Sequence, residues 1–144
     1  MEVRSKVYTY HTEVKWTEQR KGVISCAGKP DIQVATPPEF KGHEGIWSPE
    51  DLFVASANVC VMTTFLAVAE RAGLAFTSYE SVAEGRLELV DGKFQFTAIT
   101  LKPTITLPAN ADAAKAKELI EKAEANCLIS NSMKARVSLE ATIR

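Results

Sequence analysis

An uncharged and largely apolar segment, Leu52 to Ala69, constrains the fold of this 144-residue chain more than any other feature of its sequence. Signals for helix ends frame the segment, because Ser48 is a good N-cap, Pro49 suits the first helical position and Gly73 is a typical stop. They predict one helix of about 24 residues, roughly 36 Å long. A helix so long and so apolar needs cover on most of its sides, which one small domain hardly provides, so we expect a partner subunit.

The same segment is long enough to cross a membrane. It also carries small and polar residues, and charged residues flank it closely at Glu50, Asp51, Glu70 and Arg71. We therefore expect a buried helix of a soluble protein or dimer, and no membrane insertion. The first residues of the chain lack the apolar stretch of a secretory signal, which makes the cytoplasm the expected location.

The composition is that of one globular domain, residues 1–144, without a strong bias of charge. Hydrophobic residues make up 46% of the chain, and 17 Lys and Arg against 18 Asp and Glu give a formal net charge of −1. This balance offers no basic surface for nucleic acid. The three cysteines are widely spaced, and neither His11 nor His43 lies at metal-ligand spacing from the other or from a cysteine. We expect neither a disulfide scaffold nor a metal site.

Alternating and helical patterns on both sides of the long helix predict an α+β fold, with antiparallel sheet packed on helices. The predicted strands are a run around Val14 and Trp16, then Val23–Cys26, Ile32–Ala35, 79–90, 93–107 and 135–144. Asp91-Gly92 predicts a tight hairpin, and Thr36–Gly45 predicts a loop. A second, amphipathic helix is predicted over Asn110–Asn126, followed by a short turn or helical piece, "CLISNSM".

Two cysteines are candidates for chemistry. Cys60 lies about three turns inside the long helix, where the field of the helix N-terminus has faded, so a reactive thiolate there needs another positive group. Without one, Cys60 is a small hydrophobic residue of the core. Cys127 sits at the break between the second helix and a polar turn, and a second cysteine near a first can trap a sulfenic acid as a disulfide. The residues themselves leave open whether the two thiols meet.

The stretch "SPEDLFVASANVCVMTTFLAVAERAGL" and the later "CLISNS" before a final strand resemble the OsmC/Ohr family, the osmotically inducible protein C and organic hydroperoxide resistance proteins. The resemblance covers nearly the whole chain. It implies an OsmC-like fold, with antiparallel sheets around a long central helix, in an intertwined homodimer whose active sites lie at the subunit interface. Residue by residue, it implies a peroxidatic Cys60, a resolving Cys127, an active-site Glu50 and, in "EQRKG", the Arg20 that supplies the cation.

The activity that the resemblance implies is a cysteine-based peroxidase that reduces organic hydroperoxides, and hydrogen peroxide as an alternative substrate, in defence against oxidative stress. No cofactor or metal is expected, and an external dithiol, often of the dihydrolipoyl type in the family, would reset the enzyme. Two other hypotheses stay open: a protein of this fold that binds a small apolar molecule, and a thiol redox sensor without turnover. Read singly, Glu50 is also a residue that favours the helix dipole, and Arg20 a residue of a surface turn.

Several residues depart from the family pattern or have no role in it. Many members have proline immediately after the second cysteine, where this chain has Leu128, so the local turn and the access of Cys127 are expected to differ. Cys26 is expected to be a structural thiol of a strand. His43 matches no family role, and Trp47 is expected either to pack the loop or to line the entrance of an apolar pocket.

Overall fold

The computed structural model describes residues 6–144, and its contacts divide the chain into two compact units. The N-terminal unit ends at Leu52, and the C-terminal unit is Phe53–Arg144. The N-terminal unit contains a three-stranded antiparallel sheet in the order β1-β2-β3. Its strands are β1 (Glu13–Glu18), β2 (Lys21–Ser25) and β3 (Ile32–Ala35), followed by the 3-10 turn η1 (Pro38–Phe40).

The N-terminal strands confirm the predicted ones, with β2 beginning two residues before the predicted Val23 and ending one residue before Cys26. The predicted loop, Thr36–Gly45, is not wholly irregular, because η1 lies inside it. Proline presets the φ angle of a helical turn, and the Phe40 N–H donates to the Pro37 carbonyl at 3.0 Å. The loop therefore contains one tight turn before it reaches the long helix.

Helix α1 (Pro49–Ala72) begins and ends where the sequence predicts. Ser48 Oγ accepts from the Asp51 N–H at 3.1 Å, and the Asp51 carboxylate accepts from the Ser48 N–H at 3.0 Å, which is a capping box. At the other end, Gly73 has a φ of 68° and the Leu74 N–H donates to the Ala69 carbonyl at 2.9 Å. These are the features of a Schellman motif, so local chemistry fixes both ends of α1.

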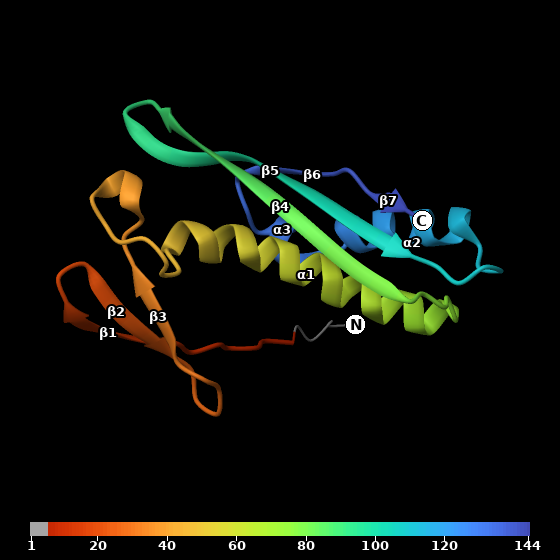
Figure 1. Cartoon of the computed structure of the whole chain (residues 1–144), viewed down its shortest axis with the longest axis horizontal. Helices are drawn as coiled ribbons and strands as arrows, with labels where there is room; N and C mark the ends of the chain where they lie inside the picture. Colours follow the sequence, from red (N-terminus) through yellow and green to blue (C-terminus); the bar gives the residue numbers. More distant parts are fainter. Residues whose placement is uncertain (1–5) are drawn as a thin grey trace, which may run out of the picture. The chain divides into compact units, whose positions relative to one another are not determined.

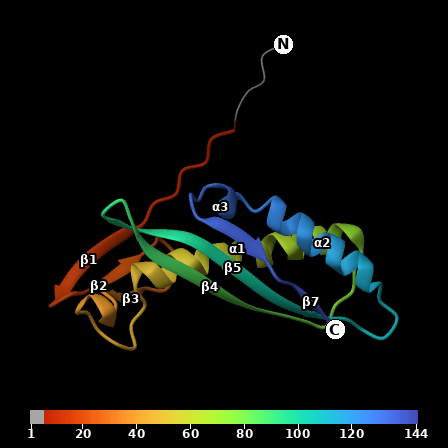
Figure 2. The ribbon, with the colours of Figure 1, turned by 90° about the horizontal axis from the view of Figure 1, so that it is seen from above.

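The C-terminal unit is a mixed sheet with helices packed on one face (Figures 1 and 2). The long strands β4 (Ser78–Val90) and β5 (Lys93–Thr106) pair antiparallel across the predicted hairpin, in which Asp91 and Gly92 both have positive φ. The short strands β6 (Arg136–Leu139) and β7 (Thr142–Ile143) pair with β5 in parallel. The predicted α+β class is confirmed, and the sheet is antiparallel only in part.

The last strand is predicted as one run over 135–144 but is divided into β6 and β7. On β5, Leu101 pairs with Leu139 and Thr104 pairs with Thr142, so Pro103 lies opposite the gap between the two pieces. Proline has no N–H for the ladder, which accounts for an interruption at this level. The predicted inward face is confirmed, because alternate residues pack against the core: Val137, Leu139, Ala141 and Ile143.

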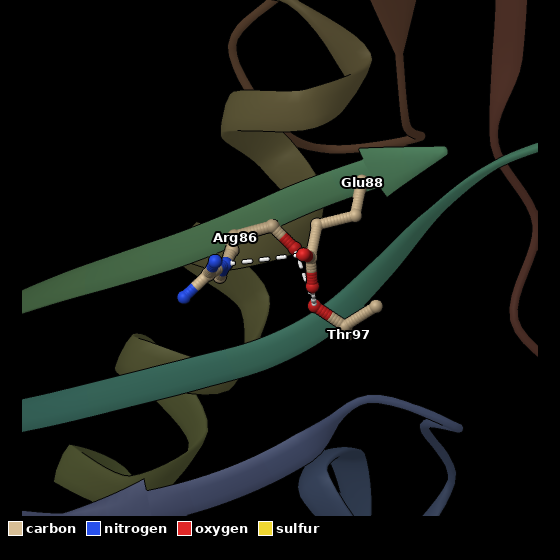
Figure 3. Close-up of polar contacts among 3 residues, drawn as sticks. All are labelled: Arg86, Glu88 and Thr97. Carbon is tan, nitrogen blue, oxygen red and sulfur yellow. Dashed lines mark hydrogen bonds and ion pairs between the residues drawn. The ribbon is translucent and has the colours of Figure 1, made fainter. Parts of the chain in front are cut away.

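A β-bulge at Thr97, whose side chain lies beside those of Glu88 and Arg86 (Figure 3), changes the face that β5 buries. Consecutive residues of β4, Arg86 and Leu87, pair with Ala98 and Phe96, so Thr97 is the extra residue. Its hydroxyl hydrogen-bonds the Glu88 carboxylate, which also pairs with Arg86 Nε at 3.4 Å. The sequence predicts one face of alternating residues through Phe94, Phe96 and Ala98. Phe96 packs against the core, but Phe94 is 60% exposed, and beyond the bulge the other set of alternating positions is buried. There the buried residues are Ile99, Leu101, Pro103 and Ile105.

The core lies between α1, the sheet and α2 (Ala113–Ala125), whose apolar stripe is buried as predicted at Ala116, Leu119, Ile120 and Ala123. Helix α1 approaches the sheet closely at Gly85, where a Cβ would overlap the side chains of Val54 and Phe96. Phe53 stacks on Phe96 with ring centroids 4.9 Å apart. The short helix α3 (Leu128–Asn131) follows α2, as the turn or helical piece predicted for this segment.

One side of α1 stays uncovered. Val59 is 53% exposed and Leu66 is 39% exposed, and Thr63, Ala67 and Glu70 are exposed on the same side of the helix. Among residues 6–144, α1 is the one helix long and apolar enough to cross a membrane, a property that core helices of soluble proteins share. The C-terminal unit therefore buries one side of α1 and leaves an apolar stripe on the other.

Candidate functional site

Cys60 lies in the middle of α1 with a half-buried side chain. One helical turn later, Thr64 Oγ1 donates to the Cys60 carbonyl at 2.8 Å and lies 4.0 Å from the Cys60 sulfur. Thr63 Oγ1 also donates to that carbonyl, at 3.0 Å. The Thr64 hydroxyl therefore lies beside the thiol, while both threonines bond the backbone of the same residue.

Cys127 is the N-cap of α3 and is fully buried. Its backbone is extended, with φ −70° and ψ 111°, and its sulfur accepts from the Ser130 N–H at 3.5 Å. The Asn131 N–H donates to the Cys127 carbonyl at 3.0 Å. A capping cysteine replaces the usual hydroxyl or carboxylate here, so α3 holds the sulfur at a fixed place beside its first turn.

The structure brings Cys60 and Cys127 together, although many residues separate them in the sequence. Burial by itself raises the pKa of the Cys60 thiol, but four hydrogen-bonding groups outweigh it. In decreasing order they are the Cys127 side chain, the Ile129 backbone, the Thr64 side chain and the Leu128 backbone. The pKa of Cys60 is therefore lowered, which favours the thiolate, the nucleophilic form of a cysteine.

The pKa of Cys127 is raised. Burial raises it first, and the hydrogen bond and the charge of Cys60 raise it further, while the side chain and backbone of Ser130 lower it in part. The pair is therefore unequal, since the pKa of Cys60 is lowered and that of Cys127 is raised, which favours Cys60 as the thiolate. In such an unequal pair, the thiol with the lower pKa is the better candidate for the nucleophile.

Leu128 gives the site a donor that proline could not give. Its backbone N–H is one of the groups that lower the pKa of Cys60, whereas proline has no N–H. The side chain of Leu128 is 69% exposed and contributes little to packing. Leucine at this position therefore keeps a backbone donor that acts on Cys60.

Leu128→Pro is expected to raise the pKa of Cys60 and to leave the fold intact. The backbone accepts proline because Leu128 is the first residue of α3 and Cys127 before it is extended. The measurement is the ultraviolet absorbance of the thiolate against pH in a Cys26→Ser background. Leu128→Ala, which keeps the N–H, is the matched control and should titrate as the parent does. Equal titration of the proline and alanine variants would show that this N–H does not act on Cys60.

Arg20 lies in the turn between β1 and β2, as predicted, within the N-terminal unit. Its Nη1 donates to the Phe40 carbonyl at 2.8 Å, and its own carbonyl accepts from the Thr36 N–H at 3.1 Å. It lines a pocket of about 330 Å³ together with Trp16, Pro49 and neighbouring residues. The pairing of Arg20 with Cys60 stays a prediction, because Cys60 belongs to the C-terminal unit.

Glu50 lies in the first turn of α1, ten residues before Cys60, where a carboxylate is favoured by the helix dipole. Its Oε1 is buried and has no hydrogen-bond partner among residues 6–144. No ion pair joins it to Arg20 within those residues, since Arg20 binds the Phe40 carbonyl. Glu50 therefore holds a free buried acceptor, and its predicted pairing with Arg20 stays a prediction.

The remaining residues of interest lie in the N-terminal unit. Cys26 directly follows β2 and is half-buried beside an apolar pocket of about 360 Å³. The His43 N–H donates to the Thr36 carbonyl at 2.9 Å. The Trp47 backbone bridges to Val34 of β3, and its side chain is 52% exposed at a pocket of about 380 Å³. In the described part of the chain, no three His, Cys, Asp or Glu side chains gather as a metal site would require.

Sequence reasoning missed the groups that act on the thiols from close by. These groups are Cys127, Thr64 and the backbone at the start of α3, which lower the pKa of Cys60. The cation that the sequence predicts, Arg20, lies in the N-terminal unit, so its effect on Cys60 stays a prediction. Sequence reasoning also gave no role to Ser130. The sequence carries no signal for the N-cap at Cys127, because cysteine is not among the preferred N-cap residues and the group that it binds is the Ser130 backbone N–H.

Curated relatives agree with this architecture. The chain is 27% identical over 135 residues to the uncharacterized protein YmaD of Bacillus subtilis, covering 91% of this chain and 90% of that protein. It is 31% identical over 105 residues to the peroxiredoxin OsmC of Escherichia coli, covering 73% of this chain and 72% of that protein.

Solved structures show the same fold. An OsmC-like protein of unknown function from Vibrio cholerae superimposes with a TM-score of 0.86 at 23% identity, over 94% of this chain and 99% of that chain. An organic hydroperoxide resistance protein from Elizabethkingia anophelis gives 0.76 at 22% identity, over 97% and 98%. The family model described as OsmC-like protein matches residues 42–142, a span that contains Glu50, both cysteines and most of the C-terminal unit. The chain therefore belongs to the OsmC-like protein family.

Proposed function

We propose that this protein is a cysteine-based hydroperoxide reductase, in which Cys60 attacks the peroxide and Cys127 resolves the product. Family membership and the relative named peroxiredoxin OsmC support a hydroperoxide-related role. The observation that carries the finer proposal is the interacting pair of thiols, with the pKa of Cys60 lowered and that of Cys127 raised. A protein that only binds a ligand has no need of such a pair.

The proposed first step is attack by the Cys60 thiolate on the terminal oxygen of a hydroperoxide. The S–O bond forms as the O–O bond breaks, and the leaving alkoxide takes a proton to become an alcohol, or water when the substrate is hydrogen peroxide. The sulfur loses two electrons to the peroxide and becomes a sulfenic acid. The hydrogen bonds around Cys60 hold the thiolate ready for this attack.

In the second step, Cys127 attacks the sulfenic sulfur of Cys60. The S–S bond forms, the S–O bond breaks, and the hydroxide leaves as water with the proton of Cys127. An external dithiol, for which a dihydrolipoyl group is our first choice, then reduces the disulfide by exchange and is itself oxidised to a disulfide. No metal or organic cofactor takes part in this scheme.

Arg20 and Glu50 complete the proposed site. Arg20 would bring a cation to the thiolate and the peroxide, and the free buried oxygen of Glu50 is a suitable acceptor for a guanidinium. The protein is proposed to act in the cytoplasm, on organic hydroperoxides first.

The proposal is tested with purified protein, a dithiol, and cumene hydroperoxide or hydrogen peroxide in separate reactions. Loss of peroxide is expected with dihydrolipoamide, together with a Cys60–Cys127 disulfide seen by mass spectrometry when the reductant is left out. Cys26→Ser is the matched control and should react as the parent does. A protein that consumes neither peroxide would contradict the proposed function and favour a binding role.

We also propose that a second copy of the chain covers the exposed stripe of α1 in a homodimer. Val59→Asp combined with Leu66→Glu is expected to give monomers, because two charges cannot stay buried unpaired in an apolar interface. Light scattering after size-exclusion chromatography measures the mass. Lys117→Glu makes the same change of net charge on the exposed side of α2 and should leave a dimer. A wild-type protein with the mass of a monomer would contradict the proposal.

A further inference from the structure

Ser130 of α3 has a buried hydroxyl without an evident function. The residue is 7% exposed, and its Oγ is buried and makes no well-formed hydrogen bond among residues 6–144. Buried hydroxyls in proteins are normally hydrogen-bonded, because an unmet donor or acceptor costs stability. Packing in the resting protein therefore does not explain why this buried position carries a hydroxyl.

The sulfur of Cys127 is the reactive group nearest in the chain to this hydroxyl. Cys127 caps α3, and Ser130 follows it by three residues, so that the Ser130 N–H donates to the Cys127 sulfur at 3.5 Å. The Ser130 side chain also lowers the pKa of Cys127, against the effects of burial and of Cys60. Cys60 on α1 is the ionisable group among the named causes of the pKa shift of Cys127, alongside burial and Ser130.

We infer that the Ser130 hydroxyl is the donor that stabilises the Cys127 thiolate when Cys127 attacks the oxidised Cys60. This inference rests on the proposed function and adds a residue to its second step. In the resting protein the hydroxyl makes no well-formed hydrogen bond among the described residues, although the Ser130 side chain already lowers the pKa of the Cys127 thiol. Once Cys60 carries oxygen, the thiol must give up its proton, and rotation about a single bond points the Ser130 O–H at the sulfur. A charge-assisted hydrogen bond then stabilises the thiolate.

Formation of the Cys60–Cys127 disulfide needs no proton from Ser130. The Cys127 S–H proton and the hydroxyl of the Cys60 sulfenic acid leave as water, the S–O bond breaks and the S–S bond forms. Ser130 neither gains nor loses a proton overall. It lowers the cost of the thiolate that forms on the way to the disulfide, so its loss should slow resolution and leave peroxide attack by Cys60 largely unchanged.

The test uses Ser130→Ala in the full-length Cys26→Ser protein. Each protein receives a single equivalent of cumene hydroperoxide, is quenched with acid at intervals, and is analysed by mass spectrometry for sulfenic acid and disulfide. We expect disulfide formation to slow by about tenfold at neutral pH. This is the effect expected from the loss of one hydrogen bond to a charged group. The pH midpoint of disulfide formation should move upward, while the rate of Cys60 oxidation stays near that of the parent.

Two variants and a melting curve separate this role from a structural one. Ser132→Ala removes an exposed hydroxyl that bonds the Leu128 carbonyl in the same turn, and it should resolve at the parental rate. Ser130→Thr keeps the hydroxyl and should retain most of the rate. Ser130→Ala should melt close to the parent, because the lost hydroxyl makes no well-formed hydrogen bond among residues 6–144. A folded Ser130→Ala protein with parental rate and pH profile would overturn the inference.

A second arm keeps the test independent of peroxide chemistry. Cys60 is converted to a mixed disulfide with glutathione, and release of glutathione reports attack by Cys127 on the Cys60 sulfur. Here too Ser130→Ala should release glutathione about tenfold more slowly than the parent. If the wild type fails to reduce peroxide but Ser130→Ala is slow in this arm, the proposed function fails and the role of Ser130 stands. Equal rates in this arm would overturn the role of Ser130 alone.

Discussion

Cys60→Ser is expected to lower the rate of peroxide reduction by roughly a thousandfold or more, as removal of an enzymatic nucleophile commonly does. Serine keeps the size of the side chain and its hydrogen bonds, but its hydroxyl does not ionise. The cysteine thiol has a lowered pKa, which favours the thiolate. The measurement is the disappearance of cumene hydroperoxide in the presence of dihydrolipoamide.

The matched control for this variant is Cys26→Ser, which removes a half-buried thiol of the N-terminal unit. Its rate should equal that of the wild type. Thermal melting of both variants checks that the fold survives. The peroxidase proposal would be wrong if Cys60→Ser reduced peroxide as fast as Cys26→Ser does.

Cys127→Ser is expected to stop the reaction after its first step. The variant should consume a single equivalent of peroxide and then carry a persistent sulfenic acid on Cys60, because an alcohol does not form the disulfide. Excess peroxide should convert that species irreversibly to sulfinic acid, and turnover with the dithiol should be lost. Mass spectrometry of the intact protein follows both products, with a reagent that traps sulfenic acid.

The wild type should show neither product in quantity, because its disulfide forms in their place. Ser132→Ala is a suitable control, since it changes the same turn without removing a thiol. Parental turnover by Cys127→Ser would mean that the external thiol reduces Cys60 directly. In that case the two cysteines would still be neighbours, but Cys127 would have no resolving function.

The elements with strong local signals were predictable from the sequence. Ser48 and Asp51 form the predicted start of α1, Gly73 ends it, and Asp91-Gly92 makes the predicted hairpin. The four apolar positions of α2 are buried as its pattern indicates. Each of these signals depends on hydrogen bonds or side chains within a few residues, so the neighbouring sequence contains the information needed.

The wrong predictions concern strands whose buried face or ends depend on the strand that they pair with. The bulge at Thr97 shifts β5 by a residue, and a shift of one residue exchanges the two faces of a strand. The final strand divides opposite Pro103, a residue more than thirty positions earlier in the chain. Neither event is visible in the alternating pattern of a single strand, because pairing partners distant in the sequence decide both.

For the candidate site, the sequence by itself determined which residues are present: a cysteine inside a long apolar helix, a second cysteine at a helix start, and the motif that marks the family. Only the tertiary structure decided that α3 places Cys127 and two backbone donors beside Cys60. The pKa of a thiol depends on the groups within a few ångströms of its sulfur, and those groups come from distant parts of the chain. Packing therefore lowers the pKa of Cys60 and raises that of Cys127.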